Sequence, residues 1–300
     1  MSASAPSVPG THRLRTYASF VRLEHTLFSL PLILAGVFSA PGPAMAWPRW
    51  LLTAAAAVGA RTAGMSLNRL IDRHIDARNP RTQVRELPAG RMRLAEAVML
   101  LAGSVTVYAV ACAALGRWYL EVAIVPLAVF TLYPYLKRFT PLCHIGVGAA
   151  LALSPLAGFA AAHPDLVHPG PAFALAAFAL VWVTGFDIIY ATLDEGFDRA
   201  HGIHSAIVWL GRAGGLRASW ALHLVAMGAL ALVWWLLVRG RMAPLPFVVA
   251  LACFAATVVL LTLEQRWAED VNLAFFKTNV WVGCAVLGLV LAARWGTGGF

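Results

Sequence analysis

Residues 170–198, GPAFALAAFALVWVTGFDIIYATLDEGFD, decide the class of fold. The stretch begins with 17 residues that carry no charge and ends with Asp187, Asp194, Glu195 and Asp198. About 20 apolar residues are enough for a helix to cross the hydrocarbon core of a bilayer. The stretch therefore predicts a membrane-spanning helix whose last turns present acidic side chains.

The whole chain has the composition of a membrane protein. Of its 300 residues, 60% are hydrophobic and 12% are charged, whereas soluble domains are about 25% charged. Apolar stretches of spanning length recur nine times, which predicts an all-α transmembrane domain with nine spans. We place them at residues 18–40, 48–72, 94–115, 118–137, 141–162, 170–194, 213–238, 244–263 and 271–293.

The sequence before and within the first span indicates where the transmembrane domain begins. Residues 1–11, MSASAPSVPGT, are small and polar and predict a disordered tail, so the transmembrane domain covers residues 12–300. The first apolar run contains Arg22 and Glu24 and is longer than the core of a signal peptide. We therefore expect it to be retained as a helix.

The formal net charge of +9 is explained by membrane topology. If the N-terminus is cytoplasmic, 18 of the 23 Lys and Arg residues fall on the cytoplasmic side of the nine predicted spans. This asymmetry is typical of cytoplasmic loops. It predicts a multi-pass protein of the cytoplasmic membrane, in contact with lipid, and leaves no basic excess to indicate nucleic-acid binding.

The acidic residues are concentrated rather than scattered. Asn68, Asp72 and Asp76 follow one another at i,i+4 spacing near the end of the second span, so they share one helix face. Acids at membrane depth are costly and are functional candidates. Six of the 14 acidic residues belong to such helix ends, namely Asp72, Asp76, Asp187, Asp194, Glu195 and Asp198.

A second DxxxD pair follows the sixth span. Asp194 and Asp198 repeat the spacing 122 residues after the first pair, and Tyr190 takes the place of the asparagine. The repetition predicts an internal duplication of the bundle. The alternative is that both pairs are ordinary helix ends whose acids form solvated salt bridges.

Four carboxylates suit Mg²⁺, which prefers oxygen ligands and is commonly shared with phosphate oxygens. We therefore predict Mg²⁺ as cofactor and a diphosphate as its companion ligand, held by Asp72, Asp76, Asp194 and Asp198. Basic residues near the acidic helix ends can bind phosphate oxygens. The candidates, which can also be simple topological anchors, are Arg78, Arg81, Arg85 and Lys137.

Two arginines lie deeper in the predicted bundle. Arg61 is seven residues before the first motif and Arg22 lies in the first span. Either can bind the carboxylate of a co-substrate, or pair with an internal acid such as Glu24 or Asp187. Among the nine histidines no metal-binding spacing occurs, and His144 is expected to pack between helices.

At these residues the chain resembles the UbiA superfamily of intramembrane aromatic prenyltransferases. The resemblance rests on the two aspartate motifs, residues 68–76 and 187–198. It extends to Asn79-Pro80-Arg81-Thr82, Leu87-Pro88-Ala89-Gly90, Tyr133-Pro134 with Lys137-Arg138-Phe139-Thr140, and His201-Gly202-Ile203-His204-Ser205. It implies nine helices around a central cavity with a lateral opening for a lipid tail.

The resemblance also implies a reaction, the transfer of a polyprenyl group from its diphosphate to an aromatic ring. Residues 22–31 and 187–191 look like the quinone-pathway branch, whose acceptors include 4-hydroxybenzoate and 1,4-dihydroxy-6-naphthoate. On this reading Asp72 and Asp194 act through the metal, and Asn68 orients a ligand. Asp187 activates the phenol and Tyr190 shields an allylic cation.

Two other interpretations remain open. Within the family, the acceptor can instead be a haem, a chlorophyll precursor or a glycerol-phosphate lipid. Outside it, a cation-coupled transporter also combines inverted repeats with intramembrane acids. The position of these acids at helix ends, rather than in broken helices, favours the enzyme.

Overall fold

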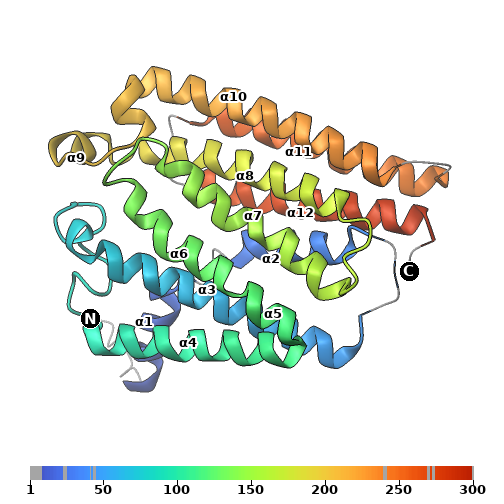
Figure 1. Cartoon of the computed structure of the whole chain (residues 1–300). Coiled ribbons are helices and arrows are strands. Elements are labelled where there is room, and N and C mark those ends of the chain that lie inside the picture. Colours follow the sequence, from blue (N-terminus) through green and yellow to red (C-terminus); the bar gives the residue numbers. More distant parts are fainter. Residues whose placement is uncertain are drawn as a thin grey trace, which may run out of the picture. The chain divides into compact units, whose positions relative to one another are not determined.

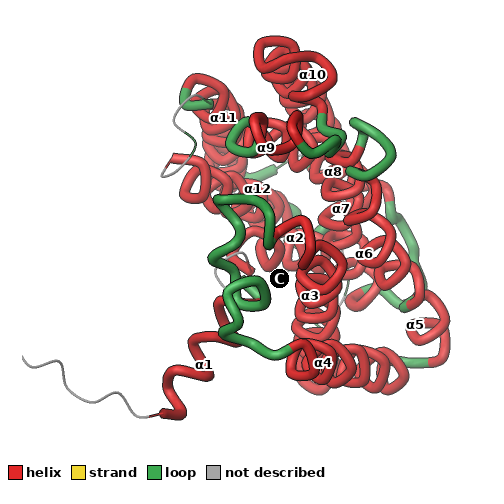
Figure 2. Tube along the Cα trace, turned by 90° about the vertical axis from the view of Figure 1, so that its left-hand side faces the viewer, coloured by secondary structure: helices red, strands yellow, loops and turns green. Residues whose placement is uncertain are grey.

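A computed structural model describes residues 9–22, 26–40, 42, 45–238, 242–268, 271 and 274–298. Throughout these residues the regular elements are helices joined by loops, with no β-strand (Figures 1 and 2). The prediction of an all-α fold is therefore confirmed for the described chain. The helices are α1 (Pro9–Phe20), α2 (Thr26–Phe38), α3 (Trp47–Asp76), α4 (Leu94–Leu115), α5 (Arg117–Val122), α6 (Ile124–Leu136), α7 (Cys143–Ala162), α8 (Gly170–Ala191), α9 (Glu195–Ala200), α10 (Ala206–Leu237), α11 (Pro244–Arg266) and α12 (Ala274–Gly296).

The chain divides into two compact units. Unit 1 comprises Met1–Thr26 and Ala54–Thr131, and unit 2 comprises Leu27–Thr53 and Leu132–Phe300. The first aspartate motif, at the end of α3, belongs to unit 1. The second motif, at the end of α8 and in α9, belongs to unit 2.

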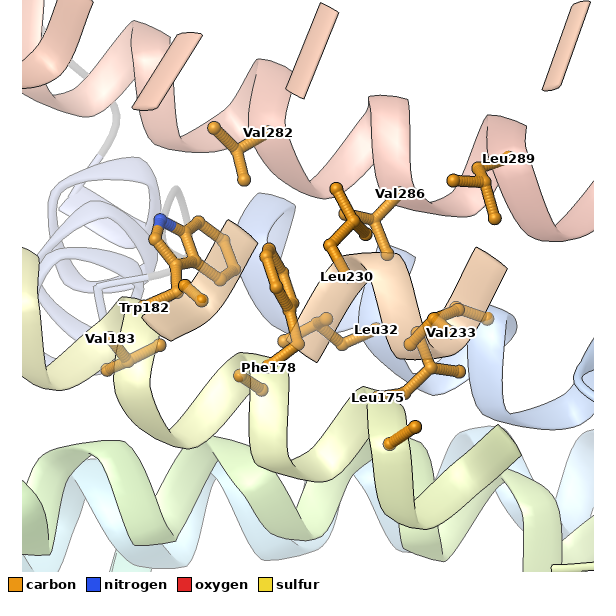
Figure 3. Packing of buried hydrophobic residues seen from close by; sticks show 14 of the residues in the cluster. Leu32, Leu175, Phe178, Trp182, Val183, Leu230, Val233, Val282, Val286 and Leu289 are labelled. Atoms are coloured by element: carbon orange, nitrogen blue, oxygen red, sulfur yellow. The ribbon is translucent and has the colours of Figure 1, made fainter. Parts of the chain in front are cut away.

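The core of unit 2 forms around α8. This helix is apolar on every side and most of its residues are buried, as expected for a helix enclosed by others. In Figure 3 its side chains Leu175, Phe178 and Trp182 pack among residues from α2, α10 and α12. Those partners include Leu32, Leu230, Val233, Val282, Val286 and Leu289.

Helices α2 and α7 of unit 2 approach each other at two glycines. A Cβ atom on Gly36 would collide with the backbone of Pro155, and one on Gly158 would collide with the backbone of Ile33. Small residues allow such close contact between helix backbones in membrane proteins. The two glycines therefore set the distance between α2 and α7.

Unit 1 has a smaller core beside the first motif. Phe20, Leu70, Met92 and Ala97 are buried together and join α1, α3 and the start of α4. Farther along α3, a Cβ atom on Gly59 would meet the backbone of α4. The packing fixes the end of α3 that carries the aspartates.

Seven helices of the described chain are long and apolar enough to cross a membrane, so the chain is a multi-pass membrane protein. They are Leu94–Leu115, Arg117–Leu136, Cys143–Ala162, Gly170–Ala191, Ala206–Leu237, Pro244–Arg266 and Lys277–Gly296. These correspond to the last seven predicted spans. Helix α10 begins at Ala206, seven residues before its predicted span, and contains a kink at Gly211 (φ 71°, ψ 164°).

The first two predicted spans do not reach this standard, and neither nine spans nor the internal duplication is confirmed. The predicted span 18–40 is divided between α1 and α2, which is 13 residues long. Helix α3 has 30 residues but carries several charged side chains. Residues 1–8 of the predicted tail lie outside the described chain, and α1 begins at Pro9, inside the tail's predicted range.

Candidate functional site

The first aspartate motif lies on a buried face of α3. The side chains of Asp72 and Asp76 are 1% and 4% exposed. The amide Nδ2 of Asn68 donates a hydrogen bond to Oδ2 of Asp72 over 3.3 Å. The i,i+4 spacing thus places three polar side chains along one face, as predicted.

The loop after α3 returns a cation to this face. Nη1 of Arg85 lies 2.7 Å from both carboxylate oxygens of Asp76. Two local bonds shape the loop: Asn79 Oδ1 accepts from the backbone N–H of Arg81 at 2.9 Å, and the Thr82 hydroxyl donates to the Asp76 carbonyl at 3.1 Å. Arg85, a predicted diphosphate ligand, is therefore the counter-ion of a predicted metal ligand.

The other predicted phosphate contacts of unit 1 are placed differently. Arg78 is exposed, and its Nε donates to the backbone carbonyl of His74 at 3.3 Å, so it covers the end of α3. Arg81 is partly buried in the turn described above. Both lie in the loop that follows α3, as Arg85 does.

The two predicted acceptor-binding arginines are brought together in unit 1. Nη2 of Arg61 donates to the backbone carbonyl of Arg22 at 3.0 Å. Arg22 has a positive φ of 49°, a conformation that non-glycine residues adopt uncommonly. Glu24, considered as an alternative partner for these arginines, lies outside the described residues.

Arg69, which directly follows Asn68, is a further buried residue of this region that the sequence motifs did not single out. Its Nε donates to the carbonyl of Phe20 at 3.4 Å. The bond joins α3 to the end of α1. An arginine inside a predicted span was the available signal, since such a cation must find a partner.

In unit 2, Asp187 has a partner that the sequence did not indicate. Its Oδ2 lies 2.7 Å from Nδ1 of His144, and Nε2 of the same imidazole lies 3.2 Å from the backbone nitrogen of Ala206. His144 is buried and packs between helices, as expected, but the sequence did not indicate these two hydrogen bonds. The two residues are 43 positions apart, so no local spacing relates them.

The second aspartate pair lies at the short helix α9. Asp198 is buried, and the Ser205 hydroxyl is its hydrogen-bond partner. Burial and the neighbouring carboxylate of Asp194 raise the pKa of Asp198 to about 6, while Lys137 acts in the opposite direction. Two carboxylates that disfavour each other's charge are suited to sharing a cation.

The loop between α9 and α10, residues 201–205, brings Lys137 to this carboxylate pair. The backbone N–H of His204 donates to the carbonyl of Lys137 at 2.7 Å, and Sγ of Cys143 donates to the carbonyl of His204 at 3.3 Å. The predicted phosphate ligand Lys137 thus lies in the same cluster as Asp198. The sequence identified the motif at residues 201–205, but not the hydrogen bonds through which this loop holds Lys137 near the carboxylates.

Tyr190 lies one turn before Asp194 and is partly buried. It packs, with Leu193 and Leu216, against a small cluster formed by Ile189, Ala268 and Val271. This places an aromatic ring beside the second motif within unit 2. Its role in shielding an allylic cation stays a prediction.

Each unit carries two of the four predicted metal ligands. Among the residues that the structure describes, no three His, Cys, Asp or Glu side chains lie close enough together to hold a metal ion. The donors themselves fit a hard divalent cation, because they are carboxylates and three of them are buried. Burial, and after it the carboxylate of Asp194, raises the pKa of Asp198, and a bound cation would offset both effects.

The family profile and the individual relatives that match this sequence point to the same family. The profile of the UbiA prenyltransferase family matches residues 29–294. The 4-hydroxybenzoate octaprenyltransferase of Coxiella burnetii (strain RSA 493 / Nine Mile phase I) is 31% identical over 241 residues, which are 80% of this chain and 82% of that protein. The 4-hydroxybenzoate octaprenyltransferase of Azotobacter vinelandii is 34% identical over 233 residues, 77% of each chain.

Solved structures agree with the sequence comparison. A UbiA homologue from Aeropyrum pernix K1 superimposes with a TM-score of 0.78 and 34% identity, covering 89% of this chain and 98% of its own. A UbiA homologue from Archaeoglobus fulgidus bound to GPP and Mg²⁺ has a TM-score of 0.71 at 15% identity, covering 94% and 99%. The second likeness concerns the fold alone.

Proposed function

The chain belongs to the UbiA prenyltransferase family, and from that premise we propose that it transfers a polyprenyl group to the ring of a hydroxylated aromatic acid. The donor is a polyprenyl diphosphate. The first acceptor to consider is 4-hydroxybenzoate, because relatives 31% and 34% identical are named for that substrate. The acceptor 1,4-dihydroxy-6-naphthoate is the second candidate of the same chemical class.

The observation that carries the proposal is the burial of Asp72, Asp76 and Asp198 in a chain of this family. A buried carboxylate is stabilised by a nearby cation, and Asp76 already has one such partner in Arg85. We propose that these three and Asp194 hold Mg²⁺ together with the diphosphate. When bound, the metal supplies Lewis-acid neutralisation of the leaving group.

The chain's own cations complete the binding of the diphosphate. We propose that Lys137 and Arg85 contact its phosphate oxygens, with Arg78 and Arg81 in the same loop as Arg85. Asn68 orients Asp72 through the hydrogen bond already described. These groups neutralise charge that develops as the carbon–oxygen bond of the donor breaks, which is the main catalytic demand.

The acceptor is held and activated by other residues. We propose that Arg61 or Arg22 binds its carboxylate, and that Asp187 accepts the proton of its hydroxyl group. The ring carbon beside that oxygen then forms the bond to the allylic carbon as the diphosphate leaves. The hydrogen on that ring carbon leaves as a proton to the released diphosphate, and Asp187 returns its proton to the oxygen. The ring of Tyr190 faces the allylic cation and reduces its exposure to water.

We also propose the finer membrane topology. The N-terminus and the loops after α3 and α8 lie on the cytoplasmic side of the cytoplasmic membrane, since most Lys and Arg residues fall there. Helices α2 and α3 supply two further spans, to give nine in one domain of residues 12–300, with 1–11 as a tail. The repeated DxxxD spacing supports an internal duplication of this domain.

The experiment is incorporation of a radiolabelled polyprenyl diphosphate into each of the two aromatic acids by the purified protein in detergent. We expect a labelled product that requires Mg²⁺ and is abolished by EDTA, by Asp72→Asn and by Asp194→Asn. The matched control is Glu121→Gln, because this acid is exposed on α5 and pairs with Arg117. Diphosphate release without either product would contradict the proposed acceptor class. Uptake of a solute into vesicles without diphosphate release would support the transporter instead.

A further inference from the structure

Three helices of unit 2 meet at the imidazole of His144. The residue lies in the first turn of α7, its Nδ1 is 2.7 Å from Asp187 of α8, and its Nε2 is 3.2 Å from the backbone nitrogen of Ala206, the first residue of α10. The imidazole is 5% exposed and the Asp187 side chain 26% exposed. The histidine is therefore enclosed, whereas the carboxylate has an open side.

These two bonds determine which nitrogen of His144 carries the proton. A backbone N–H can only donate, so Nε2 must accept from Ala206 and carries a lone pair. A neutral imidazole with a bare Nε2 has its hydrogen on Nδ1. That hydrogen points at Oδ2 of Asp187, which accepts it.

We propose that His144 is a positioning residue for Asp187. Its Nδ1–H occupies one carboxylate oxygen and fixes the orientation of the other, Oδ1, toward the acceptor's hydroxyl group. The inference rests on the proposed role of Asp187 as the group that accepts the phenolic proton. His144 does not take that proton itself, because protonation of Nε2 would place an N–H against the N–H of Ala206.

The surrounding backbone holds this arrangement rigidly. A Cβ atom on Gly148, one turn after His144, would collide with the Leu180 carbonyl and the Thr184 hydroxyl, so α7 and α8 are in close contact there. At the other nitrogen, Ala206 follows Ser205, whose hydroxyl caps α10 by accepting from Val208 and also bonds Asp198. The imidazole thus links the acceptor-activating carboxylate to the loop of the second aspartate pair.

The test compares three single variants in the prenyl-transfer assay. His144→Leu removes both hydrogen bonds, and we expect kcat to fall by about 100-fold, the cost of misplacing a reacting group by about 1 Å. The KM for the prenyl diphosphate should change less than about twofold. His144→Gln should recover most of kcat, since one amide can donate to Asp187 and accept from Ala206.

The matched control is His163→Leu, an equally drastic change at the opposite end of the same helix. His163 directly follows α7, is buried, and bonds the carbonyl of Val37 at the end of the helix opposite His144. Its kcat should stay near the wild-type value. A fall in kcat equal to that of His144→Leu would show a general effect of damaging α7 and would overturn the proposal.

A double-mutant cycle with Asp187→Asn separates positioning from mere stability. If His144 acts through Asp187, adding His144→Leu to Asp187→Asn lowers kcat no further. Equal losses in both backgrounds, or a His144→Gln variant as slow as His144→Leu, would refute the role of His144 alone. A wild-type protein that forms no prenylated acid would instead refute the proposed function, and with it this role.

Discussion

Asp76 and Arg85 form an ion pair in which one guanidinium nitrogen, Nη1, lies 2.7 Å from both carboxylate oxygens. The pair is largely removed from solvent, with side chains 6% and 19% exposed. A predicted metal ligand is thus neutralised by a predicted diphosphate ligand. In the proposed function, Asp76 binds the metal and Arg85 binds the diphosphate, so donor binding exchanges this ion pair for one new partner on each residue.

Arg85→Gln should therefore weaken donor binding. Loss of a charge-assisted hydrogen bond of about 1.5–3 kcal/mol predicts a KM for the prenyl diphosphate raised by about tenfold or more. The KM for the aromatic acid should not change. Steady-state kinetics with each substrate varied in turn checks this, and Arg117→Gln, on the exposed surface of α5, is the control. An unchanged KM for the prenyl diphosphate would contradict a contact between Arg85 and the diphosphate and would assign Arg85 a structural role as the partner of Asp76.

The raised pKa of Asp198 predicts a pH-dependent stability. The folded chain binds the carboxyl proton more tightly than the unfolded chain, because burial and Asp194 raise the pKa to about 6. Without metal, the ionised group therefore destabilises the fold at pH 7, and this cost disappears as the pH falls through about 6 toward 4. Thermal unfolding in EDTA should show Asp198→Asn more stable than wild type at pH 7 and equal to it near pH 4. An equal difference at both pH values would contradict the assigned pKa.

The close contact between α2 and α7 predicts a steric effect on stability. Gly158→Ala places a methyl group against the backbone of Ile33, where no side chain can move aside. We expect a loss of about 1–3 kcal/mol in the free energy of unfolding, seen as a lower Tm in detergent. Gly228→Ala is the matched control, because no atom lies within 4 Å of the added Cβ on this residue of α10. A Tm that falls equally in both variants would argue against the contact.

Arg61 is expected to govern recognition of the acceptor's carboxylate. Arg61→Ala should raise the KM for 4-hydroxybenzoate by about tenfold. A phenol that lacks the carboxylate should be a poor substrate of the wild-type protein and should be unaffected by the substitution. Because Arg61 also donates to the Arg22 carbonyl, the Tm of the variant has to be measured beside its kinetics. A loss of activity equal for both acceptors would assign Arg61 a structural role.

Local patterns in the sequence determined the membrane class, the last seven spans and the first aspartate face. The second motif was expected at the end of one helix, but α8 ends at Ala191, Asp194 precedes α9, and Asp198 lies in α9. Hydropathy over about 20 residues reports a spanning helix directly, and i,i+4 spacing fixes a shared face within one helix. For this reason the spacing alone was enough to group Asn68, Asp72 and Asp76. The first predicted span was less secure, since its apolar run hid the break between α1 and α2.

Only the tertiary structure decided which side chains are partners. His144 and Asp187 are 43 residues apart, and their bond depends on the rotation and close approach of α7 and α8, which Gly148 permits. Arg85 returns to Asp76 because a loop of turns, and not a helix, separates them. Sequence periodicity orients residues within one helix, whereas packing between helices sets how the faces of different helices meet.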